Sequence, residues 1–203
     1  MRHLWFLAFL LTASALTLPA CDSGEEKEGL DTEREIGCDD PEAIAFRVRP
    51  KATYLRTAST DRAEEAPAYR LSDRGLAPGD SLNLQRLGEY QYRTPTDPDS
   101  VRYGILAVFS STSTLLDADQ PNRVPGAIDA GEDYVTGLTN LSPRVPTDIA
   151  EDFAVFDVEG VNDTETIVIP DGAVYLFVSP EDNSFGDNQD EDGDFRLCVE
   201  VLN

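Results

Sequence analysis

The residues best suited to chemistry in this chain lie in one acidic segment near the C-terminus, residues 181–194. Seven of its fourteen positions are Asp or Glu, and none is Lys or Arg. Carboxylates this close together repel one another unless a cation lies among them. Hard oxygen ligands with Asn and Gly between them suit Ca²⁺ better than any other common ion. The segment therefore predicts a calcium-binding loop, with a solvated run of charge as the alternative.

Other side chains offer little for catalysis. The only His is His3 and the only Trp is Trp5, both within an N-terminal segment that we predict to be removed. Without His, the mature chain has no Ser-His-Asp or Cys-His machinery, no His-ligated zinc and no His general base. A glycosidase-like carboxylate pair remains a formal alternative, although acids are so frequent here that pairs arise by chance. The sequence predicts that the protein is not an enzyme.

The N-terminus has the organisation of a lipoprotein signal peptide, residues 1–20. Arg2 precedes an apolar run at residues 4–11, and Leu-Pro-Ala-Cys at residues 18–21 resembles a bacterial lipobox. Pro19 interrupts the apolar stretch before it reaches the about 20 residues of a membrane-spanning helix. We expect acylation of Cys21 and a membrane-anchored lipoprotein of the cell envelope, with secretion without lipid as the alternative.

The segment that follows Cys21 differs from the rest of the chain. Residues 21–40 contain almost no apolar side chains, so they cannot bury enough surface to offset their chain entropy. We predict a flexible acidic tether there, followed by one folded domain at residues 41–203.

The chain is strongly acidic, with 39 Asp and Glu against 16 Lys and Arg, a net charge of −23. Removing residues 1–20 takes away Arg2 and no acid. Such a surface repels nucleic acid and anionic lipid headgroups and favours cations. We therefore expect no nucleic-acid partner, and membrane association only through Cys21.

Two cysteines remain once Cys21 carries lipid, Cys38 and Cys198. Disulfides persist in exported proteins, so we predict a bridge that ties the first residues of the domain to its last strand. In that strand Phe195, Leu197, Val199 and Val201 alternate inward, which places Cys198 on the outer face with Arg196 and Glu200. We expect a bridge on the surface of the domain.

The apolar pattern indicates many short strands and no long helix. Period-two runs are separated by turn signals such as Pro-Gly-Asp at residues 78–80. This pattern predicts an all-β domain, an antiparallel β-sandwich or jelly roll. The runs at 105–109 and 175–178 read as the most deeply buried. Strands are expected at residues 43–49, 52–57, 68–72, 81–87, 89–93, 103–111, 153–158, 165–169, 173–179 and 195–201. Residues 115–149 have little strand signal, and loops of such length are usually functional or mobile.

Two segments resemble the calcium-dependent galactophilic lectins of bacteria. One is Ala-Pro-Gly-Asp-Ser-Leu-Asn-Leu-Gln-Arg-Leu-Gly-Glu-Tyr-Gln-Tyr at residues 77–92. The other runs from Ile-Pro-Asp-Gly at 169–172 through Ser-Phe-Gly-Asp-Asn at 184–188. The resemblance implies a small jelly-roll sandwich that binds glycans through calcium.

The resemblance also implies a set of calcium ligands. Carried over position by position, they are the side chains of Asp182, Asp187 and Asn188 and the backbone carbonyls of Tyr92 and Ser184. Two carboxylates, an amide oxygen and two carbonyls form a reasonable calcium shell, which water or a ligand hydroxyl can complete. The lectins add a His and a Gln that contact sugar, and no counterpart of either is found here, so the sugar-binding residues are unknown.

Several alternatives remain open at this point. A second calcium could bind Asp190, Asp192 and Asp194, within a run that resembles the start of an EF-hand loop but lacks its helices. A calcium-ordered structural or adhesion domain without sugar binding is the main rival to a glycan-binding module. Asp61 lies far from the loop in the sequence, and we expect it to be independent of calcium binding.

Overall fold

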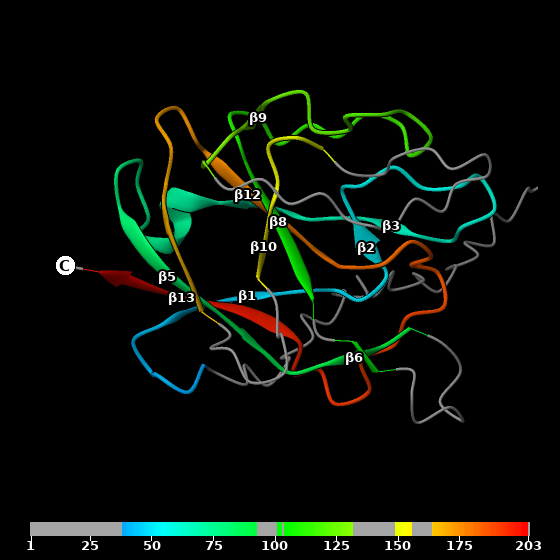
Figure 1. Cartoon of the computed structure of the whole chain (residues 1–203), viewed down its shortest axis with the longest axis horizontal. Coiled ribbons are helices and arrows are strands. Elements are labelled where there is room, and N and C mark those ends of the chain that lie inside the picture. The colour runs from blue at the N-terminus through cyan, green and yellow to red at the C-terminus, as the bar shows by residue number, and fades with distance from the viewer. Residues whose placement is uncertain (1–37, 93–100, 103, 132–148, 156–163, 203) are drawn as a thin grey trace, which may run out of the picture. The chain divides into compact units, whose positions relative to one another are not determined.

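The computed structural model describes residues 38–92, 101–102, 104–131, 149–155 and 164–202, all within one compact unit, Ile36–Asn203. The predicted signal peptide, Cys21 and most of the predicted tether lie outside these residues. The described chain is built from short strands and one 3₁₀ turn, η1 (Leu71–Arg74) (Figure 1). The strands are β1 (Ile44–Arg47), β2 (Ala52–Thr53), β3 (Glu64–Glu65), β4 (Ala68–Arg70), β5 (Ser81–Leu87), β6 (Tyr90–Gln91), β7 (Val101–Arg102), β8 (Ile105–Ser110), β9 (Ala127–Ile128), β10 (Phe153–Val155), β11 (Thr164–Val168), β12 (Tyr175–Pro180) and β13 (Arg196–Leu202).

Two antiparallel sheets dominate the fold. The first has the order β1-β13-β5-β11, and the second has the order β10-β8-β12-β4 with β9 also paired to β8. Strand β5 alternates between half-buried and buried positions along its whole length. Leu82 and Leu84 take the first two buried positions, and Arg86 takes the third. The prediction of an all-β fold with antiparallel sheets is therefore confirmed.

One core lies between the two sheets. Because successive side chains point to opposite faces, each strand sends every second residue into this core. The first sheet contributes Phe46, Leu82, Leu84, Ile167, Leu197 and Val199, and the second contributes Ile105, Ala107, Phe109, Phe153, Val155, Leu176 and Val178.

A second apolar cluster covers the other face of the second sheet. Leu106, Val108 and Phe177 pack there against side chains from five connecting segments, namely Tyr54, Leu55, Ala66, Val124, Ile149 and Phe185. Strands β8 and β12 are therefore buried on both faces, as their continuous apolar runs predict. The described part of the predicted long loop at residues 115–149 packs against this sheet, because Leu115 and Val124 belong to the second cluster.

The buried Arg123 ties this covering layer together. Its side chain is 2% exposed, and it donates to the carbonyls of Leu116, Thr53 and Leu55 at 3.0–3.1 Å. Burial lowers the pKa of Arg123, while the negative charges of Glu65 and Asp117 act in the opposite direction. The sequence pattern gives no indication of this role, because a lone Arg in a loop is ordinarily solvated.

Every predicted strand has a counterpart, and β5 has the bounds that the alternation predicts. Three two-residue strands, β3, β7 and β9, were not predicted, because pairs that short leave no period to detect. The strand expected at residues 68–72 ends two residues early, where Leu71 begins η1.

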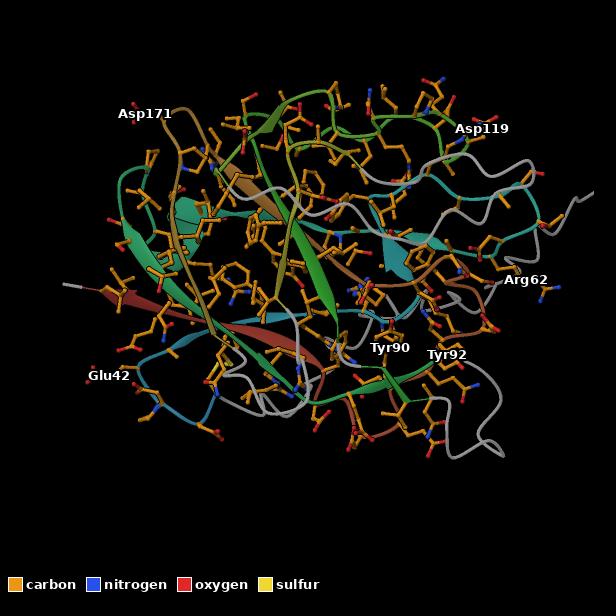
Figure 2. All side chains as sticks on the ribbon, in the orientation of Figure 1. Glu42, Arg62, Tyr90, Tyr92, Asp119 and Asp171 are labelled. Carbon is orange, nitrogen blue, oxygen red and sulfur yellow. A yellow bond between two sulfur atoms is a disulfide. The ribbon has the colours of Figure 1, made fainter. Side chains whose placement is uncertain are left out.

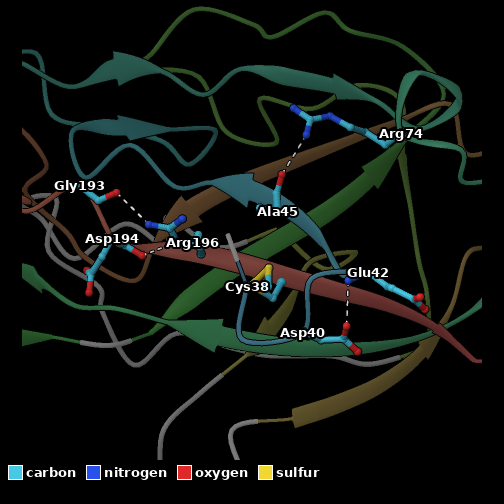
Figure 3. Close-up of a disulfide and its surroundings, with 9 residues drawn as sticks. Cys38, Asp40, Glu42, Ala45, Arg74, Gly193, Asp194 and Arg196 are labelled. Atoms are coloured by element: carbon cyan, nitrogen blue, oxygen red, sulfur yellow. Dashed lines mark hydrogen bonds between the residues drawn. A yellow bond between two sulfur atoms is a disulfide. The ribbon is translucent and has the colours of Figure 1, made fainter. Parts of the chain in front are cut away.

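The Cys38–Cys198 disulfide is present and fastens the start of the chain to β13 (Figure 3). The alternation is also as predicted, since Leu197 and Val199 reach the core and Cys198 does not. The expected solvent exposure is wrong, however, because Cys198 is only 2% exposed and its neighbour Arg196 only 6%. Figure 3 shows the chain at Cys38 lying across β13, which covers this part of the outer face.

The inward alternation of β13 ends earlier than predicted. Val201 is 37% exposed. Pairing with β1 extends only as far as Val199, so the last residues of β13 lie beyond the end of the neighbouring strand.

Candidate metal centre in the loop between the two sheets

The acidic loop connects strands of different sheets. It leaves β12 at Pro180 in the second sheet and enters β13 at Arg196 in the first. Phe185 anchors its middle, because this side chain is fully buried in the second apolar cluster. A loop held at both ends and at its centre can present its polar groups in a fixed arrangement.

Strand β6 runs along the loop and pairs with it. Gln91 and Gln189 exchange two backbone hydrogen bonds of 2.8 Å, and the bridge is antiparallel. This register places Tyr92 beside Asn188. The hydroxyl of Tyr90 donates to the carbonyl of Glu181 at 2.5 Å, which fixes the start of the loop. Figure 2 labels Tyr90 and Tyr92 next to each other at β6.

The carboxylate of Asp182 is the most unusual group in the loop. Its side chain is 8% exposed, and Oδ1 accepts a 2.7 Å bond from the N–H of Asn183. The other oxygen, Oδ2, is buried and has no hydrogen-bond donor among the described residues. Burial raises the pKa of Asp182, and the Asp187 charge adds to this; the N–H groups of Asn183 and Ser184 and the amide of Asn188 lower it.

Asn188 provides a second buried oxygen of the same kind. Its side chain is 0% exposed, and Nδ2 donates to the carbonyl of Pro50 at 2.9 Å. Because a carbonyl oxygen can only accept, this contact determines which end of the amide is nitrogen. The remaining atom, Oδ1, is buried and meets no donor in the described part of the chain.

Most of the predicted calcium ligands are thus brought together. The loop places Ser184, Asp187 and Asn188 close enough to Asp182 for each to act on its carboxyl group, and the bridge to β6 brings Tyr92 alongside. Asp187 and Ser184 are exposed, whereas Asp182 and Asn188 are buried. Two of the predicted ligands are therefore buried and two are exposed, and all of them would offer hard oxygen atoms, the donor type that Ca²⁺ prefers.

Asp61 contacts the acidic loop directly, although the two lie far apart in the sequence, and this contact leads us to predict that Asp61 influences calcium binding. Its two carboxylate oxygens accept hydrogen bonds from the N–H groups of Phe185, at 3.0 Å, and Gly186, at 2.8 Å. No signal in the sequence links these positions, which only the tertiary fold brings together. A Cβ at Gly186 would lie 2.8 Å from the N of Arg62 and 2.9 Å from Oδ1 of Asp61, so the close approach requires glycine.

A second group of carboxylates follows in the same loop. Oxygens of Asp190, Asp192 and Asp194 lie within 4.8 Å of one another. The Asp190 carboxylate accepts the N–H groups of Gly193, at 2.9 Å, and Phe195, at 3.4 Å. Burial and the neighbouring Asp192 raise the pKa of Asp190. These three side chains could hold a cation, but both oxygens of Asp190 already have backbone donors.

Backbone contacts also fix the end of the loop. Arg196 donates from Nε to the carbonyl of Asp194 at 2.7 Å and from Nη2 to that of Gly193 at 3.0 Å (Figure 3). Gly88 has a φ of +73°, and a Cβ there would lie 2.2 Å from Oδ1 of Asp194. Only glycine permits this approach of the two segments.

A tyrosine ring can stack on the face of a sugar, but three of the described tyrosines are engaged within the protein. Tyr90 is buried against Phe195 and bonded to Glu181, so it presents no face to a ligand. Tyr69 bonds to the backbone of β1. Tyr92 is half-buried and packs against the main core.

No family model, curated protein or solved structure gives a significant match to this chain. Within the described residues, no helix has both the length and the apolar character needed to cross a membrane. The function therefore has to be argued from the loop itself.

Proposed function

We propose that this protein is a calcium-binding, lipid-anchored domain of the cell envelope that binds glycans. One observation carries the calcium part: Asp182 Oδ2 and Asn188 Oδ1 are both buried and have no hydrogen-bond donor among the described residues, and their side chains lie near enough for the Asn188 amide to act on the Asp182 carboxyl group. A buried acceptor without a donor destabilises a fold by about 1–3 kcal/mol, and more if it is charged. A cation between the two oxygens removes both penalties, whereas a solvated run of charge does not explain why they are buried.

The ligand set favours calcium over other cations. Side-chain oxygens would come from Asp182, Asp187 and Asn188, and carbonyl oxygens from Tyr92 and Ser184. Ca²⁺ accepts six to eight such oxygens in flexible geometry, whereas Mg²⁺ demands near-octahedral geometry and retains water. Because a bound cation favours the charged form, it would also reverse the raised pKa of Asp182.

Glycan binding is supported by the uneven exposure of this set. Asp187 and Ser184 are exposed, so sugar hydroxyls could reach them and complete the coordination shell. The two stacked antiparallel sheets are compatible with the jelly-roll type that the lectin resemblance implies. The alternative is a calcium-ordered structural or adhesion domain, in which protein and water close the shell and no sugar binds.

Membrane anchoring rests on the sequence alone. The lipobox-like Leu-Pro-Ala-Cys and the acidic segment after Cys21 support a domain tethered to a membrane of the cell envelope. An acylated cysteine with more than one chain gives durable anchoring, whereas a single myristoyl chain does not.

Calcium titration of three proteins tests the metal site. In the parent protein, saturating calcium should raise the free energy of unfolding, by about 2.7 kcal/mol at one hundred times Kd. Asp187→Ala should remove most of this gain. Asp119→Ala removes one acid from an exposed turn that lies far from Tyr92 in Figure 2, and it should leave the gain intact. Equal calcium stabilisation in all three proteins would contradict the proposed ligands.

Asp192→Asn separates the two acidic clusters. If the cation occupies the proposed ligands, this variant keeps most of the calcium stabilisation. If the gain disappears with Asp192 and survives Asp187→Ala, the ion belongs to Asp190, Asp192 and Asp194 instead.

A glycan array with calcium and with EDTA tests the recognition function. We expect binding that EDTA and Asp187→Ala both abolish. Calcium stabilisation without any glycan signal would leave the structural-domain alternative.

A further inference from the structure

A basic segment interrupts this acidic chain. Residues 47–74 carry seven of the 16 Lys and Arg, against only four Asp and Glu, in a protein that has 39 acids. Local charge of the opposite sign to the whole protein marks a surface with its own electrostatic character. The bases are Arg47, Arg49, Lys51, Arg56, Arg62, Arg70 and Arg74.

Part of this segment closes the free edge of β1. Among the described strands, β1 is at the end of its sheet and pairs with β13 alone, so its outer carbonyls need other partners. The hydroxyl of Tyr69 donates to the carbonyl of Arg47 at 2.6 Å, and Nη1 of Arg74 donates to that of Ala45 at 3.0 Å. Figure 3 shows Arg74 reaching back to Ala45 over β1.

These contacts fix the guanidinium of Arg74 in place. Its Cζ lies 5.5 Å from the ring centroid of Phe46 and 5.7 Å from that of Tyr69. The two rings pack edge to face at 5.3 Å, so they form a rigid support. The Ala45 carbonyl accepts a hydrogen bond from Nη1 alone. The other nitrogens of Arg74, Nε and Nη2, make no hydrogen bond or ion pair with any described residue.

Arg49 adds a second exposed guanidinium near the same tyrosine. It has no hydrogen bond or salt bridge to any described residue, and its side chain is exposed. The positive charges of Arg49, Arg74 and Arg47 all lower the pKa of the Tyr69 hydroxyl, against the larger opposing effect of burial. No carboxylate is among the charges that act on it.

We propose that Arg74, held over the rings of Phe46 and Tyr69, and the exposed Arg49 together form a binding site for a ligand that carries a single oxyanion group. A guanidinium fork matches a carboxylate, phosphate or sulfate group through paired N–H donors. Arg74 is already ordered by Ala45 and the two rings, so little side-chain entropy is lost when the ligand binds. This site uses none of the proposed calcium ligands, and it stands whether or not calcium binds.

The surrounding charge limits the ligand to one anionic group. The protein as a whole carries −23, and at physiological salt the screening length is only about 8 Å. A single oxyanion beside the arginines experiences mostly their charge. A polyanion such as nucleic acid extends over the acidic surface and is repelled there.

NMR of the mature chain in EDTA tests the site while calcium is absent. The probes are D-glucuronate, inorganic phosphate and sulfate, with D-glucose as the uncharged control, and the signals are the Arg Nε–Hε resonances. We expect a saturable shift of the Arg49 and Arg74 signals with at least one anion and none with glucose. The comparison of the three anions distinguishes a carboxylate from a tetrahedral oxyanion.

Charge-matched variants decide whether the site is local. Arg49→Gln and Arg74→Gln should each weaken binding by about tenfold or more, the equivalent of one charge-assisted hydrogen bond. Arg62→Gln is the control, because it removes the same charge from an exposed position far from Arg74. Arg62 lies at the right of Figure 2, whereas η1, which contains Arg74, lies at the left of the same view in Figure 1. Arg62→Gln should change Kd by less than about twofold.

Two results would overturn the proposal. One is the absence of a saturable shift with every anion. The other is equal weakening in all three variants, which would show a response to net charge only. If Arg74→Gln does not fold, Arg74→Lys keeps the charge and removes the fork, and an unchanged Kd in that variant would equally contradict the role of Arg74.

Discussion

The N–H of Gly186 donates to Oδ1 of Asp61 at 2.8 Å, across 125 positions of the chain. The other oxygen of Asp61 accepts the N–H of Phe185, so one carboxylate holds two consecutive backbone groups of the acidic loop. Both donors are neutral and the acceptor is charged, which makes these the stronger kind of hydrogen bond. Asp61 therefore has a structural role in the loop, and it cannot serve as a remote control for calcium binding.

Asp61→Ala is expected to lower the free energy of unfolding by at least about 2 kcal/mol, because two partly buried N–H groups lose a charged acceptor. It should also weaken calcium binding, since the loop that carries the ligands is released. Urea unfolding with and without calcium measures both effects. Asp119→Ala is the matched control and should stay within about 0.5 kcal/mol. Equal stability of the two variants would show that the Asp61 bonds contribute nothing.

Arg123→Met should destabilise the domain by roughly 3 kcal/mol, since the carbonyls of Leu116, Thr53 and Leu55 lose their donor inside the protein. Met retains much of the side-chain volume, so the effect reports the lost hydrogen bonds more than a cavity. Arg62→Met, at an exposed position, provides the comparison and should be nearly neutral. Chemical denaturation of both variants is the measurement, and a neutral Arg123→Met would mean that water replaces the guanidinium at little cost.

The Cys38–Cys198 bridge closes a loop with a sequence separation of 160 residues. The chain-entropy relation gives about 5 kcal/mol as an upper value for a loop of that length. Replacing both cysteines by Ala should lower the urea midpoint substantially. Because Cys198 is buried, dithiothreitol should reduce the native bridge slowly and much faster once urea opens the domain. Rapid reduction of the native protein would contradict the burial of the bridge.

Tyr69 provides a test at alkaline pH. Burial raises its pKa, although Arg49, Arg74 and Arg47 partly offset the effect. An unfolded tyrosine ionises at about pH 10, so above that value the native state keeps a proton that the unfolded state loses. The stability from this group is therefore fully present below about pH 10 and is lost as the pH rises through the native pKa.

Tyr69→Phe should remove this part of the pH dependence, and it should also lower stability by about 1 kcal/mol through the lost bond to Arg47. Tyr175→Phe is the control, because the Tyr175 hydroxyl has no hydrogen-bond partner among the described residues. Urea unfolding at a series of alkaline pH values compares the three proteins. Identical slopes for the parent and Tyr69→Phe would show that this phenol ionises in the native state as readily as in the unfolded chain.

Membrane attachment is predicted to depend on a single sulfur atom. Cys21→Ser should move the protein from the membrane fraction to the soluble fraction, since it removes the site of acylation. The fold should be unaffected, so far-UV circular dichroism of the soluble variant should show the β spectrum of the parent. A Cys21→Ser protein that still partitions with membranes would end the lipoprotein interpretation.

The sequence by itself determined the features that repeat locally. Period-two alternation is sufficient to predict β5, because alternate side chains of a strand face opposite sides. Continuous apolar runs likewise predicted that β8 and β12 are deeply buried strands, and the structure shows burial on both faces. The density of acids at residues 181–194 marked the loop, and the two cysteines left after Cys21 indicated the bridge.

The tertiary structure alone decided which distant residues act on that loop. Asp61, Pro50 and β6 all contact it, yet none carries a local signal that points to residues 181–194. The two buried oxygens of Asp182 and Asn188, the burial of Arg123 and the covering of Cys198 have the same origin. Each depends on which surfaces meet when the two sheets stack. A period in the sequence records the face on which a side chain lies, but it contains no information about the segment that will cover that face.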